Sequence, residues 1–316
     1  MRRRRVLFTP LSNGNFATMD FRTRGTGMSE FNLAGERVRS VNTVGGPSDF
    51  HDVLRLPNGN YVVATAQEDP CRLTSWGVSG PRTCINHVFQ ELTPEGVVVW
   101  EWDTSAHIPV SETPEVWREQ QFADASFPEV ADPWHYNSVE DTGDGFIISF
   151  RHLDAVYKID KRTGAIVWKL GGTRRPESLR LVGDRLNGFS GQHDARLLGD
   201  GSVSLYDNGT LGLGPSRAPR SISYAIDTGA NTATLVDDVR DAIAPTSGCC
   251  GSTRVLPGGN RVTGWGMSRH MTENRADGSR IFELSIHSFI YRALPLLPGE
   301  YSALQFRDGM DRQYAD

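Results

Sequence analysis

Short runs of alternating apolar and polar residues recur along this chain, and each ends in a tight turn that contains glycine. Alternation with a period of two is typical of half-buried strands, and Gly beside Asp or Asn marks tight turns. Residues 134–172 give the clearest example, with four strand-like runs in succession: HYNSVED, GFIISFR, AVYKIDK and AIVWKLGG. Four antiparallel strands in about forty residues is the size of one blade of a β-propeller.

The same four-strand plan recurs in four further places. The copies are HDVLRLPNGNYVVAT with VFQELTPEGVVVWEW, HDARLLGDGSVSLYDNG with RSISYAIDTGANTATLV, GSTRVLPGGNRVTGWG with MTENRADGSRIFELSI, and a weaker N-terminal copy, RVLFTPLSNGNFATMDF with MSEFNLAGERVRSV. We therefore predict an all-β fold, a six-bladed β-propeller of four-stranded antiparallel blades whose ring is closed by the N- and C-terminal strands. FIYRALPLLPG would supply a strand of an incomplete sixth blade, and a five-bladed ring is the alternative. Residues 1–316 then form a single propeller domain, in which 105–132 lacks the repeat and is predicted to be a surface insertion near the channel mouth.

Three of the repeats begin with a histidine at the same position. His51, His135 and His193 each stand eight residues before the glycine of the following turn. Because equal positions in a radial repeat meet at one centre, we expect the three imidazoles near one rim of the channel. The second strand of a repeat returns to the same rim, which places Arg151 beside His135 and Asn208 beside His193. Three imidazoles and a guanidinium would suit a small oxyanion.

Plainer interpretations exist for several of these residues. Trp134 and Trp265 lie near the predicted rim and could line an aromatic pocket or pack in the core. Arg151 could form a salt bridge with Asp154 instead of binding a ligand. The remaining histidines fall at unmatched positions and are interpreted as structural or exposed: His87, His107, His152, His270 and His287.

Composition and charge argue against nucleic acid and membranes as binding partners. The net charge of −5 at pH 7 gives no basic footprint for nucleic acid. No run approaches the roughly 18 apolar residues of a membrane helix, and the arginine-rich start at 1–5 is not followed by an apolar export segment. We therefore predict no membrane span and, unless a signal precedes this chain, a cytoplasmic location by default. Cys71 and Cys84 could pair in an oxidising compartment, whereas the adjacent Cys249 and Cys250 are expected to be small buried side chains.

At the histidine segments the chain resembles the bacterial arylsulfate sulfotransferase family. The resemblance spans roughly 49–292 and is carried by DPWHYNSVEDTGDGFIISFRH, AVYKIDKRTGAIVWKLGG, GQHDARLLGDGSVSLYDNG and CCGSTRVLPGGNRVTGWG, with EWDTSAHIPVSE and FHDVLRLPNGN. It implies a six-bladed propeller that moves a sulfuryl group from a phenolic sulfate ester to a phenol. It also implies a transiently sulfated histidine and no nucleotide sulfate donor (PAPS) or other cofactor.

The resemblance also assigns roles by position. His193 would be the nucleophile, and His135, Arg151 and His51 would hold the sulfuryl oxygens. Asn137 would orient one of the rings. Either His51 or His135 could be the general base that takes the acceptor's proton. The predicted partners are small phenols and aryl sulfates, contacted by a set that includes Asn137, Asn208, Trp134 and Trp265.

Two other functions stay open. A metal-dependent propeller hydrolase or lyase would use the channel histidines as ligands. Against it, Arg151 would repel a cation, and the matched positions offer only Asp207 and Asn208 as oxygen ligands, so we predict no bound metal. A non-catalytic propeller would bind a phenol or an oxyanion without turnover.

Overall fold

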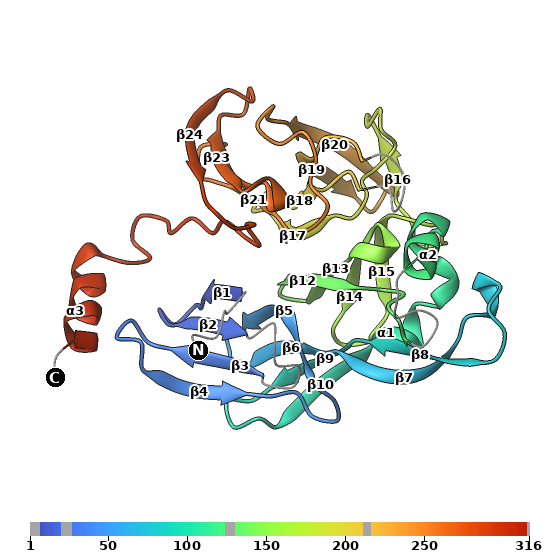
Figure 1. The fold of residues 1–316 in the computed structure, drawn as a ribbon, viewed down its shortest axis with the longest axis horizontal. Helices are drawn as coiled ribbons and strands as arrows, with labels where there is room; N and C mark the ends of the chain where they lie inside the picture. The colour runs from blue at the N-terminus through green and yellow to red at the C-terminus, as the bar shows by residue number, and fades with distance from the viewer. Residues whose placement is uncertain (1–6, 20–26, 124–129, 211–215, 315–316) are drawn as a thin grey trace. The chain divides into compact units, whose positions relative to one another are not determined.

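Strands dominate the structure and confirm the all-β class (Figure 1). The computed structural model describes residues 7–19, 27–123, 130–210 and 216–314. The chain divides into two compact units: unit 1 comprises 1–67, 86–104 and 294–316, and unit 2 comprises 68–85 and 105–293. Among the described residues, no helix is long and apolar enough to cross a membrane. The arginine-rich start at 1–5 lies outside them.

Unit 1 contains two four-stranded antiparallel sheets, and both match predicted copies of the repeat. The first pairs its strands in chain order: β1 (Leu7–Pro10), β2 (Phe16–Met19), β3 (Met28–Phe31) and β4 (Arg37–Val41). The second has the order β10-β9-β6-β5: β5 (Ser48–Arg55), β6 (Tyr61–Thr65), β9 (Val88–Leu92) and β10 (Val98–Asp103). The helix α3 (Ala303–Tyr314) also belongs to this unit, where Tyr301 just before it stacks on Phe16.

Unit 2 contains the other three predicted copies as antiparallel sheets. The first is β12 (Tyr136–Asp141), β13 (Gly145–Phe150), β14 (Ala155–Asp160) and β15 (Ile166–Gly171). The second is β17 (His193–Leu197), β18 (Val203–Asp207), β19 (Arg220–Asp227) and β20 (Thr232–Val239), to which the short β16 (Arg180–Val182) adds in parallel. The third is β21 (Ser252–Val255), β22 (Arg261–Gly264), β23 (His270–Asn274) and β24 (Arg280–Ser285). Short 3-10 turns follow two second strands: η3 (Arg151–Leu153) and η4 (Gly266–Ser268).

The core of unit 2 follows from the alternation seen in the sequence. Apolar residues of β13, β14 and β15 pack against those of β17, β18 and β19, including Ile147, Val156, Leu170, Leu205 and Ile222. Fully burying such a side chain contributes about 1.5–3 kcal/mol. Stacked sheets therefore hold the ends of their first two strands in fixed positions.

Two segments that lie outside the five repeated sheets form short elements of their own. The first contains β7 (Gln67–Arg72), η1 (Thr74–Trp76) and β8 (Pro81–Asn86). The second, which includes the predicted insertion, contains α1 (Thr104–His107), η2 (Val110–Glu112), α2 (Glu115–Phe122) and β11 (Val130–Ala131). A disulfide between Cys71 and Cys84 joins β7 to β8, which confirms the suggested pairing. Within 105–132, Ile108 and Trp117 are fully buried, and the place of this insertion near a channel mouth stays a prediction.

One expected strand does not form. Residues 286–302, which include FIYRALPLLPG, contain no strand and only an isolated bridge between Pro298 and Tyr301. Proline lacks the N–H that a ladder needs, and this stretch contains Pro295 and Pro298. The chain is fixed instead by Ile290, which packs on Val262. The expectation that this segment is a blade strand was therefore wrong.

Candidate active site

The predicted neighbours of His135 and His193 lie where the repeat places them. His135 immediately precedes β12, and its carbonyl accepts the backbone N–H of Arg151, just past β13, at 2.8 Å. His193 opens β17, and the side-chain oxygen of Asn208, just past β18, lies 2.8 Å from the ring. In both sheets the first and second strands bring a histidine and its predicted neighbour to the same end.

Strands β12 and β17 are neighbours in unit 2, so their two histidines belong to one region. The amide of Asn137 donates to the carbonyl of Gln192 at 2.7 Å, and the backbone N–H of Ala195 donates to Ser138 at 3.0 Å. The Gln192 amide in turn donates to the carbonyl of Phe150 at 3.0 Å. Asn137 therefore holds the main chain next to His193, and its predicted contact with a ring stays a prediction.

The tautomer of His193 is fixed by its partners. Its Nδ1 lies 2.9 Å from the carbonyl oxygen of Gly191 and 2.8 Å from Oδ1 of Asn208. Both are acceptors, because the Asn208 amide nitrogen donates to the carbonyl of Cys250 at 2.9 Å, so Nδ1 carries the proton. Nε2 then carries a lone pair, which accepts the backbone N–H of Cys250 at 3.2 Å. A neutral imidazole of this tautomer can act as a nucleophile when Nε2 exchanges the Cys250 N–H for a substrate atom.

Arg151 supplies a buried positive charge to the same region. Nη1 donates to Nε2 of His152 at 2.8 Å, Nη2 donates to the carbonyl of Gly248 at 3.0 Å, and the guanidinium lies 4.4 Å above the ring of Trp117. Within the described part of the chain its Nε has no hydrogen-bond partner. Burial lowers the pKa of Arg151, and the neighbouring acidic groups oppose this shift. A buried donor without a partner is costly unless a ligand satisfies it, which suits an oxyanion.

Residues 247–250 connect Arg151 to His193 through main-chain groups. Gly248 accepts from Arg151, whereas Cys250 donates to His193. Gly251 follows with a φ of +99°, and a side chain at this position would collide with Tyr206. The sulfurs of Cys249 and Cys250 lie 2.8 Å apart, and both cysteines are free thiols, of which Cys250 is buried as expected and Cys249 only partly so. The hydrogen bond to Cys249, together with burial, raises the pKa of the Cys250 thiol.

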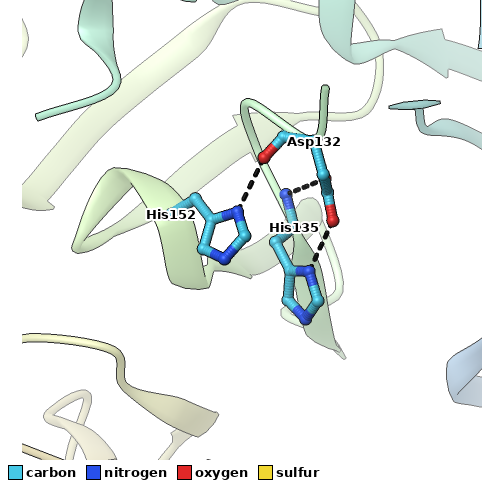
Figure 2. Close-up of side chains that lie close together, drawn as sticks. All are labelled: Asp132, His135 and His152. Carbon is cyan, nitrogen blue, oxygen red and sulfur yellow. Dashed lines mark hydrogen bonds and ion pairs between the residues drawn. The ribbon is translucent and has the colours of Figure 1, made fainter. Parts of the chain in front are cut away.

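His135 has a carboxylate partner, as Figure 2 shows. Its Nδ1 lies 2.5 Å from Oδ2 of Asp132, and its backbone N–H donates to Oδ1 of the same residue at 3.0 Å. The ring of His152 lies 4.5 Å from the ring of His135, and its Nδ1 is 2.6 Å from the carbonyl oxygen of Asp132. Burial, followed by the nearby His135, holds the pKa of His152 well below its usual value. His152 is therefore neutral, with its Nδ1–H donated to Asp132 and its Nε2 facing Arg151.

Asp132, His135 and His152 also form a group with the composition of a metal site. One ligand atom from each lies within 4.8 Å of the others. Both nitrogens of His152 are already engaged, however, and a cation here would have to displace the guanidinium of Arg151 from Nε2. The charge of Arg151 opposes such a cation, so this arrangement favours an anion.

Asp154 is connected to His193 through Gly191. Its carboxylate accepts the Trp117 indole N–H at 2.9 Å and the Gly191 N–H at 2.7 Å, instead of forming the suggested salt bridge with Arg151. The carbonyl of Gly191 accepts from Nδ1 of His193. By binding the N–H of Gly191, Asp154 therefore holds the residue that orients the His193 ring. Burial raises the pKa of Asp154 to about 6.

Backbone strain is concentrated in this region. Seven non-glycine residues among the described ranges have a positive φ, and four of them belong to the site: His135 (+49°), Asp154 (+49°), Asp194 (+61°) and Cys250 (+64°). Such conformations cost of order 1–3 kcal/mol each and persist only where the surroundings enforce them. Asp194 shows how: it is fully buried and bound by Arg196, Arg254 and Arg292.

Three other predicted residues have different surroundings. Trp134 and Trp265 are buried, and their indole N–H groups donate to the carbonyl of Ile108 at 3.1 Å and to Thr272 at 2.7 Å. These are the environments of core residues, and contact with a substrate stays a prediction. His51 belongs to unit 1, where its Nδ1 lies 2.7 Å from Asp49, and its joining the group of unit 2 also stays a prediction.

Sequence analysis missed Asp132, His152 and Trp117 as members of the site. A signal existed for two of them, because Asp132 opens the segment DPWH and His152 directly follows Arg151. Selecting histidines by equal repeat position excluded both, since neither position recurs in the other copies. Trp117 comes from α2, and nothing in its sequence surroundings indicates where that helix packs.

Comparison with known proteins gives one family and a group of related folds. The model of the family described as Arylsulfotransferase (ASST) matches residues 28–288. No curated protein matches the chain. A protein of unknown function from Bacteroides caccae is similar in structure, with a TM-score of 0.50 at 10% identity, over 90% of this chain and 83% of that one. The hydrazine synthase of Kuenenia stuttgartiensis gives 0.50 at 10% identity, over 90% and 75%. A β-propeller domain from Myceliophteria thermophila gives 0.46 at 13%, over 89% and 73%.

Proposed function

The chain belongs to the arylsulfotransferase (ASST) family, and from that premise we propose that it is an aryl sulfate sulfotransferase that works through a sulfohistidine at His193. It would move a sulfuryl group from a phenolic sulfate ester to a phenolic acceptor by a ping-pong mechanism, with neither PAPS nor a metal. The observation that carries this proposal is the fixed tautomer of His193, whose Nδ1 donates to Gly191 and Asn208 and whose Nε2 has a lone pair that would exchange the Cys250 N–H for the sulfur of the donor.

In the first half-reaction Nε2 of His193 attacks the sulfur of the donor. An N–S bond forms, the bond between sulfur and the phenolic oxygen breaks, and the phenolate leaves with the electron pair. Phenols ionise near pH 10, so a phenolate is a tolerable leaving group without full protonation. In the second half-reaction the oxygen of an acceptor phenol attacks the same sulfur, and the N–S bond returns its electrons to Nε2.

Arg151 would hold the sulfuryl oxygens during both steps, and His135 would join it whenever its Nε2 carries a proton. Negative charge spreads over these oxygens in the transition state, so fixed donors stabilise it more than the ground state. The unpartnered Nε of Arg151 supports this role, because it is a buried donor that a sulfuryl oxygen could satisfy. His51 would complete the group in a six-bladed ring closed by the terminal strands, which remains a prediction. Phenols would meet the site beside Asn137 and Asn208, with Trp134 and Trp265 as the predicted aromatic contacts.

The metal-dependent alternative draws on the proximity of Asp132, His135 and His152. It predicts a stoichiometric divalent ion in the purified protein and loss of activity with a chelator. The binding alternative predicts affinity for a phenol or an oxyanion with no covalent adduct. The disulfide between Cys71 and Cys84 favours an oxidising compartment over the cytoplasmic default, because disulfides persist where thiols are not kept reduced.

The test is the intact mass of the protein after brief exposure to an aryl sulfate without acceptor. We expect a gain of one sulfuryl group, lost again when a phenol is added. His193→Ala should gain nothing, whereas His270→Ala, which changes a partly exposed histidine on β23, should behave like the parent. An adduct on His193→Ala, or none on the parent with any aryl sulfate tested, would contradict the proposal.

A further inference from the structure

We infer that Asp132 is a positioning residue that makes His135 the general base for the acceptor phenol; this inference rests on the proposed function. The starting observation is the pair of contacts between the two residues. Asp132 accepts from Nδ1 of His135 at 2.5 Å through one oxygen and from its backbone N–H at 3.0 Å through the other. The carboxylate therefore fixes both the ring and the backbone from which it projects (Figure 2).

Holding Nδ1–H leaves the lone pair of His135 on Nε2. A carboxylate on Nδ1 also stabilises the imidazolium that forms when Nε2 takes a proton, as in the serine hydrolase triad. The surrounding charges are compatible with this role. His152, whose ring centroid lies 4.5 Å from that of His135, is neutral, and the guanidinium of Arg151 donates to Nε2 of His152. Asp132 is thus the anionic partner of His135, and Arg151 stays available for the sulfuryl oxygens.

The base and the nucleophile stand at the starts of two neighbouring strands of unit 2. His135 immediately precedes β12 and His193 begins the neighbouring β17, and the starts of these strands are joined by the hydrogen bond from Asn137 to Gln192. The side chain of His135 is 28% exposed, so a ligand can reach it. A phenol positioned to attack the sulfur on His193 would present its O–H within the same region of unit 2.

The second half-reaction conserves both protons and electron pairs. The phenol oxygen bonds to sulfur, the N–S bond breaks and its electron pair returns to Nε2 of His193, and the phenol proton moves to Nε2 of His135. The imidazolium is paired with Asp132. In the next first half-reaction it returns this proton to the departing phenolate, so the cycle neither gains nor loses a proton.

The substrate consequence is a dependence on acceptor acidity. A phenol with a pKa near 10 is protonated at neutral pH and needs a base, whereas a nitrophenol that is already ionised does not. Asp132 should therefore matter for weakly acidic phenols and hardly at all for acidic ones. A residue with a purely structural role would affect both classes equally.

The experiment uses single turnover of the sulfated full-length protein with phenols of graded pKa. For Asp132→Asn we expect adduct formation from an acidic aryl sulfate within about threefold of the parent. Discharge to phenols of pKa near 10 should fall on the order of 100-fold, and discharge to ionised nitrophenols by less than about threefold. Asp154→Asn is the matched control, a carboxyl group of the same site bound to Trp117 and Gly191, and any loss it causes should not depend on the acceptor.

Three results would overturn the inference. They are an equal loss for both classes of phenol, no loss for either class, or the same acceptor dependence in Asp154→Asn. Failure of the proposed function is distinguishable from these, because the parent protein would then form no adduct to discharge. Equal melting temperatures of the two variants would exclude a difference in folding.

Discussion

His193 and His135 occupy equivalent positions in neighbouring repeats, yet their surroundings differ in charge. Nδ1 of His193 donates to two neutral oxygens, from Gly191 and Asn208, and the residue is buried. Nδ1 of His135 faces the carboxylate of Asp132, and its side chain is partly exposed. Neutral partners fix a tautomer without favouring the imidazolium, whereas a carboxylate favours it. The same repeat position can therefore supply a nucleophile or a base, depending on whether the hydrogen-bond partner of Nδ1 is neutral or charged.

The largest effect is expected at Arg151, which binds His152 next to His135 and Gly248 in the loop that contacts His193. Arg151→Met removes the buried donor from His152 and Gly248 and from the developing charge on the sulfuryl group. We expect the rate of adduct formation to fall about 10²–10³-fold, as for loss of an oxyanion-hole donor. Pre-steady-state release of the donor phenol measures this rate. Arg162→Met, at an exposed turn position, is the control and should stay at the parent rate. Retention of the full rate in Arg151→Met would remove the guanidinium from the mechanism.

A second effect concerns stability and the carboxyl group behind His193. Burial raises the pKa of Asp154 from 3.8 to about 6, so the folded protein holds this proton more tightly than the unfolded chain does. The resulting stabilisation is fully present below about pH 4 and is lost as the pH rises through about 6. An asparagine side chain has no group that titrates, so Asp154→Asn should not show this loss. As the pH rises from about 4 to above 6, the free energy of unfolding of the parent should therefore fall by about 3 kcal/mol relative to that of the variant.

Urea unfolding of both proteins at several pH values between about 4 and 7 measures the difference. A constant difference across this range would mean that Asp154 titrates normally and that His193 has a charged carboxylate behind it throughout. His193 and His135 would then both have a charged carboxylate nearby, and they would differ only in whether that carboxylate contacts the ring directly.

The smallest effect tests the comparison most directly, by giving His193 the kind of partner that His135 has. Asn208→Asp places a carboxylate on Nδ1, which stabilises the imidazolium and removes neutral nucleophile. We expect adduct formation at neutral pH to slow about tenfold and to recover at higher pH. The rate of adduct formation across pH is the measurement. Asn208→Ala is the control, which loses the acceptor without gaining charge and should slow without a shift of its pH profile. An unshifted profile in Asn208→Asp would contradict the contrast drawn between the two histidines.

The sequence predicts the repeated sheets well, because their signal is local. Alternation and turn glycines are contained within each forty-residue copy. All five copies form four antiparallel strands of one sheet, and one of these sheets gains the parallel strand β16. The same periodicity predicts that Arg151 returns to His135 and Asn208 to His193, since register within a hairpin follows from the turn. The strand expected in FIYRALPLLPG fails because its apolar residues lack alternation and its prolines cannot pair.

The rest of the site depends on contacts between segments distant in sequence. Trp117 reaches Asp154 across 37 residues, and Gly248 reaches Arg151 across 97. Asp132 is close to His135 in sequence, but the contact of its carboxylate with the ring forms while His135 has a positive φ, which repeat periodicity does not predict. Periodicity carries no information on such contacts, so it finds the histidines and misses the groups that give them different chemistry.

The positive φ values at His135, Asp154, Asp194 and Cys250 have a consequence for protein engineering. Glycine adopts this conformation without steric cost, so a stabilised variant is readily obtained by substituting glycine where the side chain is not used. Cys250 comes nearest to such a position, because its contacts with His193 and Asn208 come from its backbone N–H and carbonyl, although glycine there would lose the buried thiol and its contact with Cys249. Relieving the backbone strain with glycine is therefore a route to higher thermal stability at Cys250. At His135 the same substitution would remove the side chain that the proposed chemistry needs.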